Sequence, residues 1–230
     1  MDNNLLVGKS LYKEYEFGKS VKVFAVNGID IDIKRGEFLS LLGRSGSGKT
    51  TLLQLLSGIV SPTRGQVFYD KKELSVMREK ERALFRNQNI GFVFQSFYVE
   101  KKFSAFDNVL FPLLITNTSK IERKERVENV MEMVGLSDRM MHKPIEMSGG
   151  ELQRLCIARA LVNDPDIIFA DEPTGQLDSQ TALQIMKLFE KLNEYGKTMV
   201  MVTHNEVDAM QYSSRIIRIN DGKVVDEVVL

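Results

Sequence analysis

The sequence predicts an α/β fold with a mainly parallel sheet, a β-rich N-terminal part and an inserted group of helices. Strand-like apolar runs alternate with helical stretches in the first and last thirds of the chain, which is typical of a parallel sheet covered on both faces. A glycine-rich turn, residues 43–50, connects an apolar run to a helical one. A charged helical stretch, residues 79–145, separates the two α/β parts.

Length and composition narrow the class of protein. The chain has 230 residues, and its 31 basic side chains balance 31 acidic ones, so no broad field of one sign attracts nucleic acid. One cysteine, Cys156, excludes an intrachain disulfide. The N-terminus lacks the pattern of a signal peptide, and no apolar stretch approaches the roughly 18–20 residues that span a bilayer. We therefore expect any membrane contact to be made through another chain.

The first two thirds of the chain give clear signals for individual elements. The first forty residues alternate apolar and polar side chains, as half-buried strands do, and they end in the apolar run Phe38–Leu42. A helix is expected to begin near Gly48. Further on, Ser119 and Glu122 predict a capping box at the start of a helix that ends before Gly135.

The last third returns to alternating strands and helices. The pattern predicts a strand at Ile167–Ala170, a helix from about Ser179 to Tyr195 and a strand at Thr198–Thr203. A further strand, RIIRIN, is followed by the turn residues DG. We therefore expect the last third to complete one sheet with the strand before the glycine-rich turn.

The glycine-rich turn carries the pattern GxxxxGK[ST] of a phosphate-binding loop. Its glycines allow backbone N–H groups to converge on phosphate oxygens, and the helix that follows adds partial positive charge. Lys49 is placed to reach the β- and γ-phosphates, and the Thr50 hydroxyl to ligate Mg²⁺. A turn without a ligand is the alternative, but it would need neither side chain. The candidate nucleotide ligands are Gly43, Arg44, Ser45, Gly46, Ser47, Gly48, Lys49, Thr50 and Thr51.

Two acidic residues, Asp171 and Glu172, follow the apolar run Ile167–Ala170. They are therefore expected at the carboxyl edge of the sheet, where ligands bind in open α/β folds and where the phosphate loop also lies. An acidic pair at a strand end is by itself usually the start of a solvated loop. Beside a phosphate loop, we interpret Asp171 as a Mg²⁺ ligand and Glu172 as the base that polarises the attacking water.

The segment MSGGELQR, Met147–Arg154, resembles the signature of ABC ATPases and stands shortly before the acidic pair. Ser148 and Glu151 within it also predict a capping box at the start of a helix. A capped helix without a ligand is the alternative, although a helix N-terminus with two glycines is itself an anion site. The segments SGSGKTTLL, GFVFQSF and DEPTGQLDS are similar to the group that includes lipoprotein-release, macrolide-export and antimicrobial-peptide-resistance systems.

Four further positions match the pattern of this family in order along the chain. Tyr15 matches the aromatic residue that stacks on adenine, although Tyr12 lies nearby as a competitor. Gln95 matches the glutamine of the loop that enters the helical subdomain, which implies roles in Mg²⁺ binding and catalysis. Asp178 matches the aspartate of the dimer-contact loop. His204 matches the switch histidine, which contacts the γ-phosphate and orients the base or the water.

The resemblance implies an ABC-type phosphate-loop NTPase core with an N-terminal antiparallel β-subdomain and an inserted α-helical subdomain. The core with its β-subdomain would comprise residues 1–95 and 161–230, and the helical subdomain residues 96–160, all within the single domain 1–230. A separate transmembrane permease subunit is the implied partner, which would place this chain at the cytoplasmic side of the cell membrane.

The resemblance also implies hydrolysis of ATP with Mg²⁺ as cofactor. The catalytic residues would be Glu172, His204, Gln95 and Lys49, and the metal ligands Thr50, Gln95 and Asp171. Ser148, Gly149, Gly150 and Asp178 would bind the nucleotide of a second copy, so that two ATP molecules lie between the chains of a head-to-tail homodimer. No role for nucleic acid is implied.

Two departures from the family pattern remove no group that the chemistry needs. Met147 stands where the signature more often begins with Leu, and Gln176 replaces the more usual Asn or Ala.

A soluble ABC ATPase of DNA repair or the ribosome is disfavoured, since the chain lacks the long insertions of those proteins. A module that binds without hydrolysis is disfavoured by the intact Glu172 and His204. A switch that regulates a membrane protein without transport, as in cell-division relatives, stays open, as do the substrate and the direction of transport.

Two expectations concern side-chain exposure. Phe97, Tyr98 and Phe103 should be partly exposed, because the family places a coupling helix of the membrane subunit in this region. Cys156 lies among apolar residues and should be buried and inert.

Overall fold

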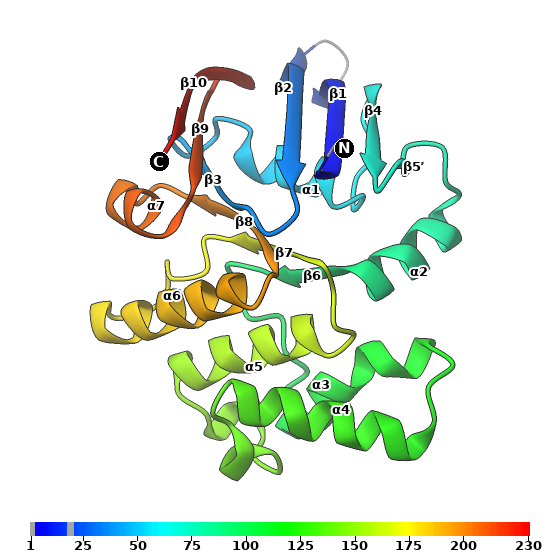
Figure 1. Cartoon of the computed structure of the whole chain (residues 1–230), viewed down its shortest axis with the longest axis vertical. Coiled ribbons are helices and arrows are strands. Elements are labelled where there is room, and N and C mark those ends of the chain that lie inside the picture. The colour runs from blue at the N-terminus through cyan, green and yellow to red at the C-terminus, as the bar shows by residue number, and fades with distance from the viewer. Residues whose placement is uncertain (1–2, 18–20) are drawn as a thin grey trace.

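The computed structural model describes residues 3–17 and 21–230, which form two sheets and the helices around them (Figure 1). The first sheet is antiparallel and has the strand order β2-β1-β4-β5. Its strands are β1 (Asn4–Phe17), β2 (Val21–Lys34), β4 (Arg64–Tyr69) and β5 (Lys72–Glu73). Every second residue of Ile29–Ile33 is buried, so the period-two pattern has placed one face of β2 in the core.

The second sheet is mainly parallel and has the order β10-β9-β3-β8-β7-β6. Its strands are β3 (Phe38–Leu42), β6 (Ile90–Val93), β7 (Ile167–Asp171), β8 (Thr198–Thr203), β9 (Arg215–Asn220) and β10 (Lys223–Val229). All residues of β3 and β8 are buried, as in parallel strands covered on both faces. The polar Ser40 within β3 is satisfied by a 2.6 Å hydrogen bond between its Oγ and that of Ser213. The predicted α/β fold is confirmed.

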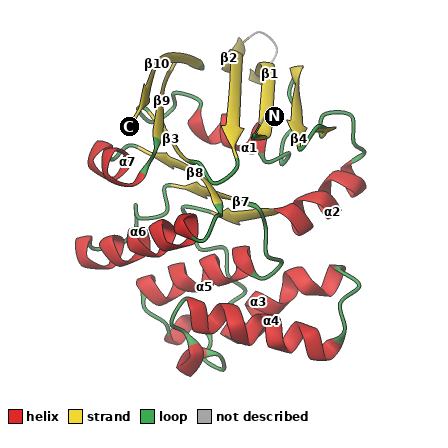
Figure 2. Ribbon diagram, viewed as in Figure 1, coloured by secondary structure: helices red, strands yellow, loops and turns green. Residues whose placement is uncertain are grey.

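The helices form layers on both sides of this sheet (Figure 2). They are α1 (Lys49–Leu56), α2 (Glu79–Asn89), α3 (Ala105–Leu110), α4 (Lys120–Met133), α5 (Gly149–Leu161), α6 (Ser179–Glu194) and α7 (Glu206–Tyr212), with 3-10 turns η1 (Phe111–Ile115), η2 (Ser137–Arg139) and η3 (Pro144–Glu146). None of the helices in the described ranges is long and apolar enough to cross a bilayer.

Two apolar clusters hold the layers together. One lies between the two sheets and surrounds α1, with Leu41 of β3 against Leu52 of the helix. The other lies on the opposite face of the parallel sheet and joins Ile168 of β7 to Leu155 of α5 and Val127 of α4. Burying a leucine or valine side chain contributes about 1.5–3 kcal/mol, so both layers are anchored to the central sheet. The predicted division of the chain into a core and a helical subdomain, with boundaries at residues 95/96 and 160/161, stays a prediction.

Helix α4 corrects one expectation. The Ser119 Oγ accepts a hydrogen bond from the Glu122 N–H at 3.2 Å, as a capping box requires. The Glu122 carboxylate, however, accepts a 2.6 Å hydrogen bond from Arg126 one turn later. Only half of the predicted box therefore forms, because an i,i+4 ion pair competes for the acid. Gly135, with φ +70°, follows the helix end as predicted.

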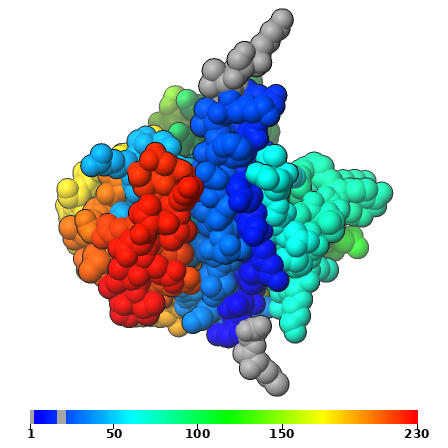
Figure 3. All heavy atoms as spheres, turned by 90° about the horizontal axis from the view of Figure 1, so that it is seen from above, coloured from blue at the N-terminus to red at the C-terminus, as the bar shows by residue number. Residues whose placement is uncertain are grey.

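The two sheets meet beside the phosphate loop. The Asn27 N–H of β2 donates to the Gly222 carbonyl in the β9–β10 turn at 2.8 Å, and the Gly222 N–H donates to the Ser47 carbonyl at 2.9 Å. In the view from above, the C-terminal strands lie beside the N-terminal ones (Figure 3). Backbone hydrogen bonds through Gly222 thus connect the loop to both sheets.

Candidate functional site

The phosphate loop opens into a cavity of about 590 Å³ at the carboxyl edge of the parallel sheet. The loop connects β3 to α1, and β8 and β7 follow β3 in the sheet, so residues far apart in sequence meet at the cavity. The lining residues are Ala25, Arg44, Ser45, Gly46, Gly48, Lys49, Thr50, Thr51, Gln95, Asp171, Glu172 and His204. The structure therefore brings most of the predicted site residues together. Ala25 of β2 was not predicted, because an alanine in a strand carries no signal of a ligand site.

Two glycines of the loop are required by close backbone contacts. A Cβ added to Gly43 would lie 2.3 Å from the Ile219 carbonyl oxygen. A Cβ added to Gly48, which has φ +102°, would lie 2.0 Å from the Ala25 carbonyl oxygen. Both contacts are far too short for any side chain, so the loop keeps its path only with glycine at these positions.

Lys49 is held inside the loop. Its Nζ donates hydrogen bonds to the carbonyl oxygens of Gly43 at 2.9 Å and of Arg44 at 2.8 Å. Burial lowers the pKa of this amine, while the nearby Glu172 and Asp171 act in the opposite direction. The Ser47 Oγ is buried and has no hydrogen-bond partner among the described residues. The loop thus offers a desolvated cation and an unpaired hydroxyl, which suits a polyanionic ligand.

Thr50 and Asp171 form a pair of side chains in the cavity that suits a divalent cation. The Thr50 Oγ1 donates to the Asp171 Oδ1 at 3.1 Å. Burial raises the pKa of Asp171, and the Thr50 hydrogen bond acts against that rise. Within residues 3–17 and 21–230 no group of three acidic, histidine or cysteine side chains could hold a metal alone. The pair fits Mg²⁺, which commonly binds one or two protein oxygens and takes phosphates and water for the rest.

Glu172 and His204 line the cavity and contact each other. The His204 Nδ1 lies 3.0 Å from the Glu172 Oε2. The Glu172 backbone is held at φ +45°, and its N–H donates to the Val202 carbonyl at 2.9 Å. A non-glycine residue at positive φ costs free energy, which the surrounding sheet has to offset. The carboxylate of this strained residue is the group that contacts the histidine.

The signature residues lie outside this cavity. Ser148 caps α5 and forms the complete predicted capping box with Glu151. Gly149 is exposed, and Gly150 is buried against α6. Asp178 caps α6, because its Oδ1 accepts hydrogen bonds from the N–H groups of Gln180 and Thr181 at 3.0 Å. One chain therefore carries two separate groups of candidate nucleotide ligands.

Tyr15 also lies outside the residues that line the cavity. It pairs with Val23 of β2, and the Lys13 Nζ lies 5.3 Å from the centre of its ring. Tyr12 is more tightly packed, since the Arg64 guanidinium lies 4.4 Å from its ring centre and its hydroxyl approaches Gly28. Tyr12 therefore has a structural explanation, and Tyr15 keeps the predicted role in adenine binding as a prediction.

Comparison with known proteins identifies the family. A model of the ABC transporter family matches residues 26–175, which is more than half of the chain. The chain belongs to this family. The ATP-binding protein LolD of the lipoprotein-releasing system of Aquifex aeolicus is 47% identical over 88% of this chain and 90% of its own length. The macrolide export protein MacB of Chlorobaculum tepidum is 44% identical over 94% of this chain and 33% of its own length.

Solved ABC transporter cassettes have the same fold. The dimeric structure of the cassette MJ0796 superposes with a TM-score of 0.90 at 40% identity and covers 98% of both chains. A dimeric post-hydrolysis state of MJ0796, bound to ADP and phosphate, superposes with a TM-score of 0.89. The predicted ABC-type fold is therefore confirmed, and this chain is an ATP-hydrolysing cassette of an ABC transporter.

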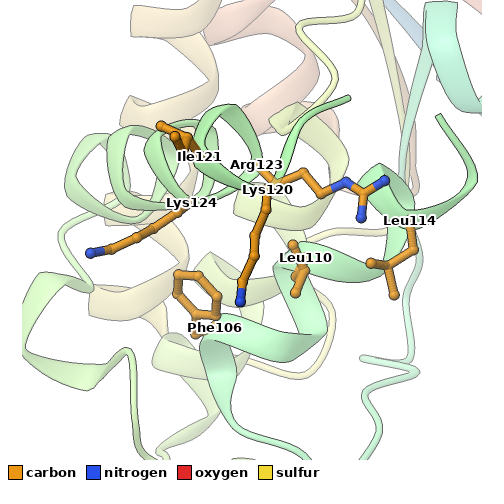
Figure 4. Close-up of a pocket in the computed structure, with 7 residues that line it drawn as sticks. All are labelled: Phe106, Leu110, Leu114, Lys120, Ile121, Arg123 and Lys124. Atoms are coloured by element: carbon orange, nitrogen blue, oxygen red, sulfur yellow. The ribbon is translucent and has the colours of Figure 1, made fainter. Parts of the chain in front are cut away.

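The ABC cassette also has an apolar cavity of about 560 Å³ between α3, η1 and α4 (Figure 4). Phe106 and Leu110 of α3 line it on one side, and Lys120 and Lys124 come from α4 (Figure 4). Neither a carboxylate nor a residue of the phosphate loop lines it.

The segment after Gln95 behaves as expected. Tyr98 and Phe103 are 69% and 48% exposed, and Phe97 is half-buried. Cys156 of α5 is buried, its thiol donates to the Phe97 carbonyl at 2.9 Å, and burial raises its pKa to about 11. The predicted burial of Cys156 is confirmed. Its inertness stays a prediction, which the raised pKa supports because a thiolate is the reactive form.

Proposed function

We propose that two copies of this cassette associate head to tail around two ATP molecules and drive a separate transmembrane subunit. One observation carries the proposal: the phosphate loop and the capped N-terminus of α5 are two anion-binding groups that do not share a cavity in one chain. A second copy related by a two-fold axis would place the phosphate loop of each chain against the α5 N-terminus of the other, which gives two equivalent sites. Ser148, Gly149, Gly150 and Asp178 would then complete the site that the partner's phosphate loop begins.

Within each site, Glu172 is the proposed base. Its carboxylate is in hydrogen-bond reach of His204, which would orient it toward a water molecule in line with the γ-phosphate. Gln95 lines the same cavity from the segment that leaves β6. The chemistry requires little covalent participation by the protein, so positioning and charge stabilisation supply most of the rate increase.

Lys49 is the proposed cation for the β- and γ-phosphates. Its Nζ would exchange the carbonyl oxygens of Gly43 and Arg44 for phosphate oxygens. Thr50 and Asp171 would hold Mg²⁺, with Gln95 as a further ligand. When bound, Mg²⁺ supplies neutralisation of phosphate charge. The buried position of Lys49 makes its charge more effective than the same charge in water.

The proposed partner is a transmembrane permease subunit, which would hold the cassette at the cytoplasmic side of the cell membrane. Tyr98 and Phe103 are exposed aromatic residues on the segment that follows Gln95, as a docking surface requires. Arg159 of α5 donates to the Tyr98 carbonyl at 2.7 Å, so force on this surface would reach the helix that carries the signature. The names of the LolD and MacB relatives favour export or mechanical work on lipoproteins, peptides or drugs.

The test is a pull-down of Glu172→Gln from native membranes with ATP and Mg²⁺. Loss of the base should leave ATP bound and keep the dimer closed on its partner, with Lys49→Ala as the matched variant that captures nothing. A polytopic partner with a large extracytoplasmic domain would support the export or mechanical role. A membrane protein without any transport activity would favour the regulatory switch. A DNA-repair or ribosomal complex would contradict the transport role.

A further inference from the structure

The helix that carries the signature has a negative charge in its first turn. The Glu151 Oε2 accepts hydrogen bonds from the Ser148 N–H and from the Ser148 hydroxyl, both at 2.8 Å. These bonds satisfy the helix terminus. The same carboxylate, however, stands beside the surface that is proposed to receive the γ-phosphate of the second copy, and like charges at short range repel. Neutralisation of Glu151 would therefore favour the binding of a phosphate at this surface.

Arg139 supplies the opposite charge. Its Nε donates to the Glu151 Oε1 at 2.8 Å, so the two carboxylate oxygens are divided between Ser148 and Arg139. Only 19% of the Glu151 side chain is exposed. Arg139 ends η2, where its N–H donates to Leu136 and its carbonyl accepts from His142, both at 3.0 Å. The guanidinium is thus attached to a fixed turn.

A second capping box in the same chain serves as an internal comparison. At the start of α3, the Ser104 N–H and hydroxyl donate to the Asp107 Oδ2 at 3.1 and 2.6 Å, and the Asp107 N–H donates back to the Ser104 Oγ at 3.1 Å. Within the described part of the chain, Asp107 makes no ion pair. A capping box therefore closes without a cation, and the Arg139 contact is not needed for that purpose.

We propose that Arg139 is a positioning residue of the composite ATP site. It neutralises Glu151 and fixes one oxygen of its carboxylate. The Ser148 hydroxyl, which here donates to Glu151, can then donate to the γ-phosphate of the ATP that the second copy binds. This inference rests on the proposed head-to-tail dimer. Arg139 acts through Glu151 and does not itself touch the nucleotide.

The test measures ATP-dependent dimer formation of Glu172→Gln by sedimentation, at low and high salt. Adding Arg139→Ala should raise the ATP concentration at half-dimerisation by about tenfold at low salt. The rise should be smaller at high salt, because salt screens the repulsion between the Glu151 carboxylate and the γ-phosphate. Arg139→Lys should restore most of the affinity. Arg126→Ala, which breaks the comparable Arg126–Glu122 pair on α4, is the matched control and should leave dimer formation unchanged.

A double variant separates charge balance from simple structure. Glu151→Gln keeps a capping side chain but removes the charge, so Arg139→Ala should have little further effect in that background. An equal loss in both backgrounds, or no loss in either, would overturn the role of Arg139 while leaving the dimer in place. If Glu172→Gln with native Arg139 stays monomeric with ATP and Mg²⁺, the head-to-tail dimer itself is wrong and this inference falls with it.

Discussion

The His204 Nδ1 and the Glu172 Oε2 lie 3.0 Å apart at the carboxyl ends of the neighbouring strands β8 and β7. The Glu172 side chain is 20% exposed, whereas that of His204 is 66% exposed. The carboxylate is thus sheltered and the imidazole can still move toward a ligand. Parallel strands bring such residues together although 32 positions separate them in the chain.

This contact predicts strong coupling between the two side chains. His204→Ala should lower kcat for ATP roughly 100-fold, because the base loses the group that orients it. In a Glu172→Gln background the same change should have little further effect on the residual rate, since both residues act in one step. Steady-state ATPase assays of the four variants give the coupling. His142→Ala, at the other histidine of the chain, is the control and should keep the native kcat.

Lys49→Met should weaken ATP binding without unfolding the cassette. Methionine keeps most of the apolar stem of the lysine but lacks the ammonium group. In the native chain this group contacts two carbonyl oxygens of the loop, and we expect it to contact phosphate oxygens when ATP binds. Charge-assisted hydrogen bonds contribute about 2 kcal/mol, which corresponds to a roughly 30-fold higher Kd. Titration calorimetry with ATP and Mg²⁺ measures it. Lys197→Met is the control, because it removes a lysine that is paired with Asp164 at the opposite edge of the sheet. An equal rise in the Kd of ATP for Lys197→Met would contradict the role of Lys49 in phosphate binding.

Gly150 fixes the distance between α5 and α6. A Cβ added there would lie 2.5 Å from the Thr181 Cγ2, and a β-branched side chain cannot turn away easily. Gly150→Ala should therefore lower the free energy of unfolding by about 1–3 kcal/mol. Thr181→Ser removes the clashing methyl group but keeps the hydroxyl that donates to Asp178, so the double variant should recover much of the loss. Thermal unfolding distinguishes the variants.

Gly149→Ala is the matched control for that pair. A Cβ at Gly149 would be 3.6 Å from Leu177, an ordinary contact, and alanine is favoured over glycine in a helix. Its melting temperature should equal or exceed that of the native chain. A fall as large as that of Gly150→Ala would mean that the helix terminus itself, and not the contact with Thr181, sets the requirement for glycine.

The catalytic edge could be predicted from the sequence because its signals are local. Nine contiguous residues define the phosphate loop. Asp171 ends the buried strand β7 and Glu172 directly follows it, so the parallel topology alone brings both acids to the edge of the sheet where the loop lies. Ala25 could not be predicted, since it lines the cavity only through the way in which the antiparallel sheet folds over α1.

Competing partners limited the rest of the prediction. The spacing of Ser119 and Glu122 indicated a complete capping box, yet Arg126 takes the glutamate. The contact between Arg139 and Glu151 joins a 3-10 turn to a helix 12 residues later, and no periodic pattern marks it. Side-chain partners across a turn depend on the exact path of the backbone, which composition and periodicity do not determine.

Glu151 should make the stability of the cassette sensitive to acid. Hydrogen bonds from Ser148 and the nearby Arg139 lower the pKa of Glu151 from 4.5 to about 2. Because the folded pKa is the lower one, the stabilisation is fully present above pH 4.5 and is lost as the pH falls toward 2. Solvent screening limits it to about 1 kcal/mol. Denaturant unfolding measures the free energy of unfolding at each pH in this range, and this free energy should change less with pH in Glu151→Gln than in the native chain. An equal pH dependence in the two proteins would contradict the stabilising role of the Glu151 carboxylate.

The two candidate tyrosines should respond to substitution in opposite ways. Tyr12 is held between the Arg64 guanidinium and Gly28, so Tyr12→Ala should lower the free energy of unfolding by about 1–3 kcal/mol. If Tyr15 stacks on adenine, Tyr15→Ala should instead raise the Kd of ATP roughly tenfold, because stacking on a base contributes about 1–3 kcal/mol. Tyr15→Phe and Tyr15→Trp keep a ring and should bind ATP as the native chain does.

The measurement for the tyrosines combines denaturant unfolding with titration of ATP and of inorganic triphosphate. The triphosphate lacks the base, so Tyr15→Ala should bind it as the native chain does, while Lys49→Met should lose affinity for both ligands. A Tyr15→Ala protein that loses affinity for triphosphate as well would indicate a distorted phosphate loop. If ATP affinity falls for Tyr12→Ala and not for Tyr15→Ala, the adenine platform lies three positions earlier in β1 than the resemblance implies.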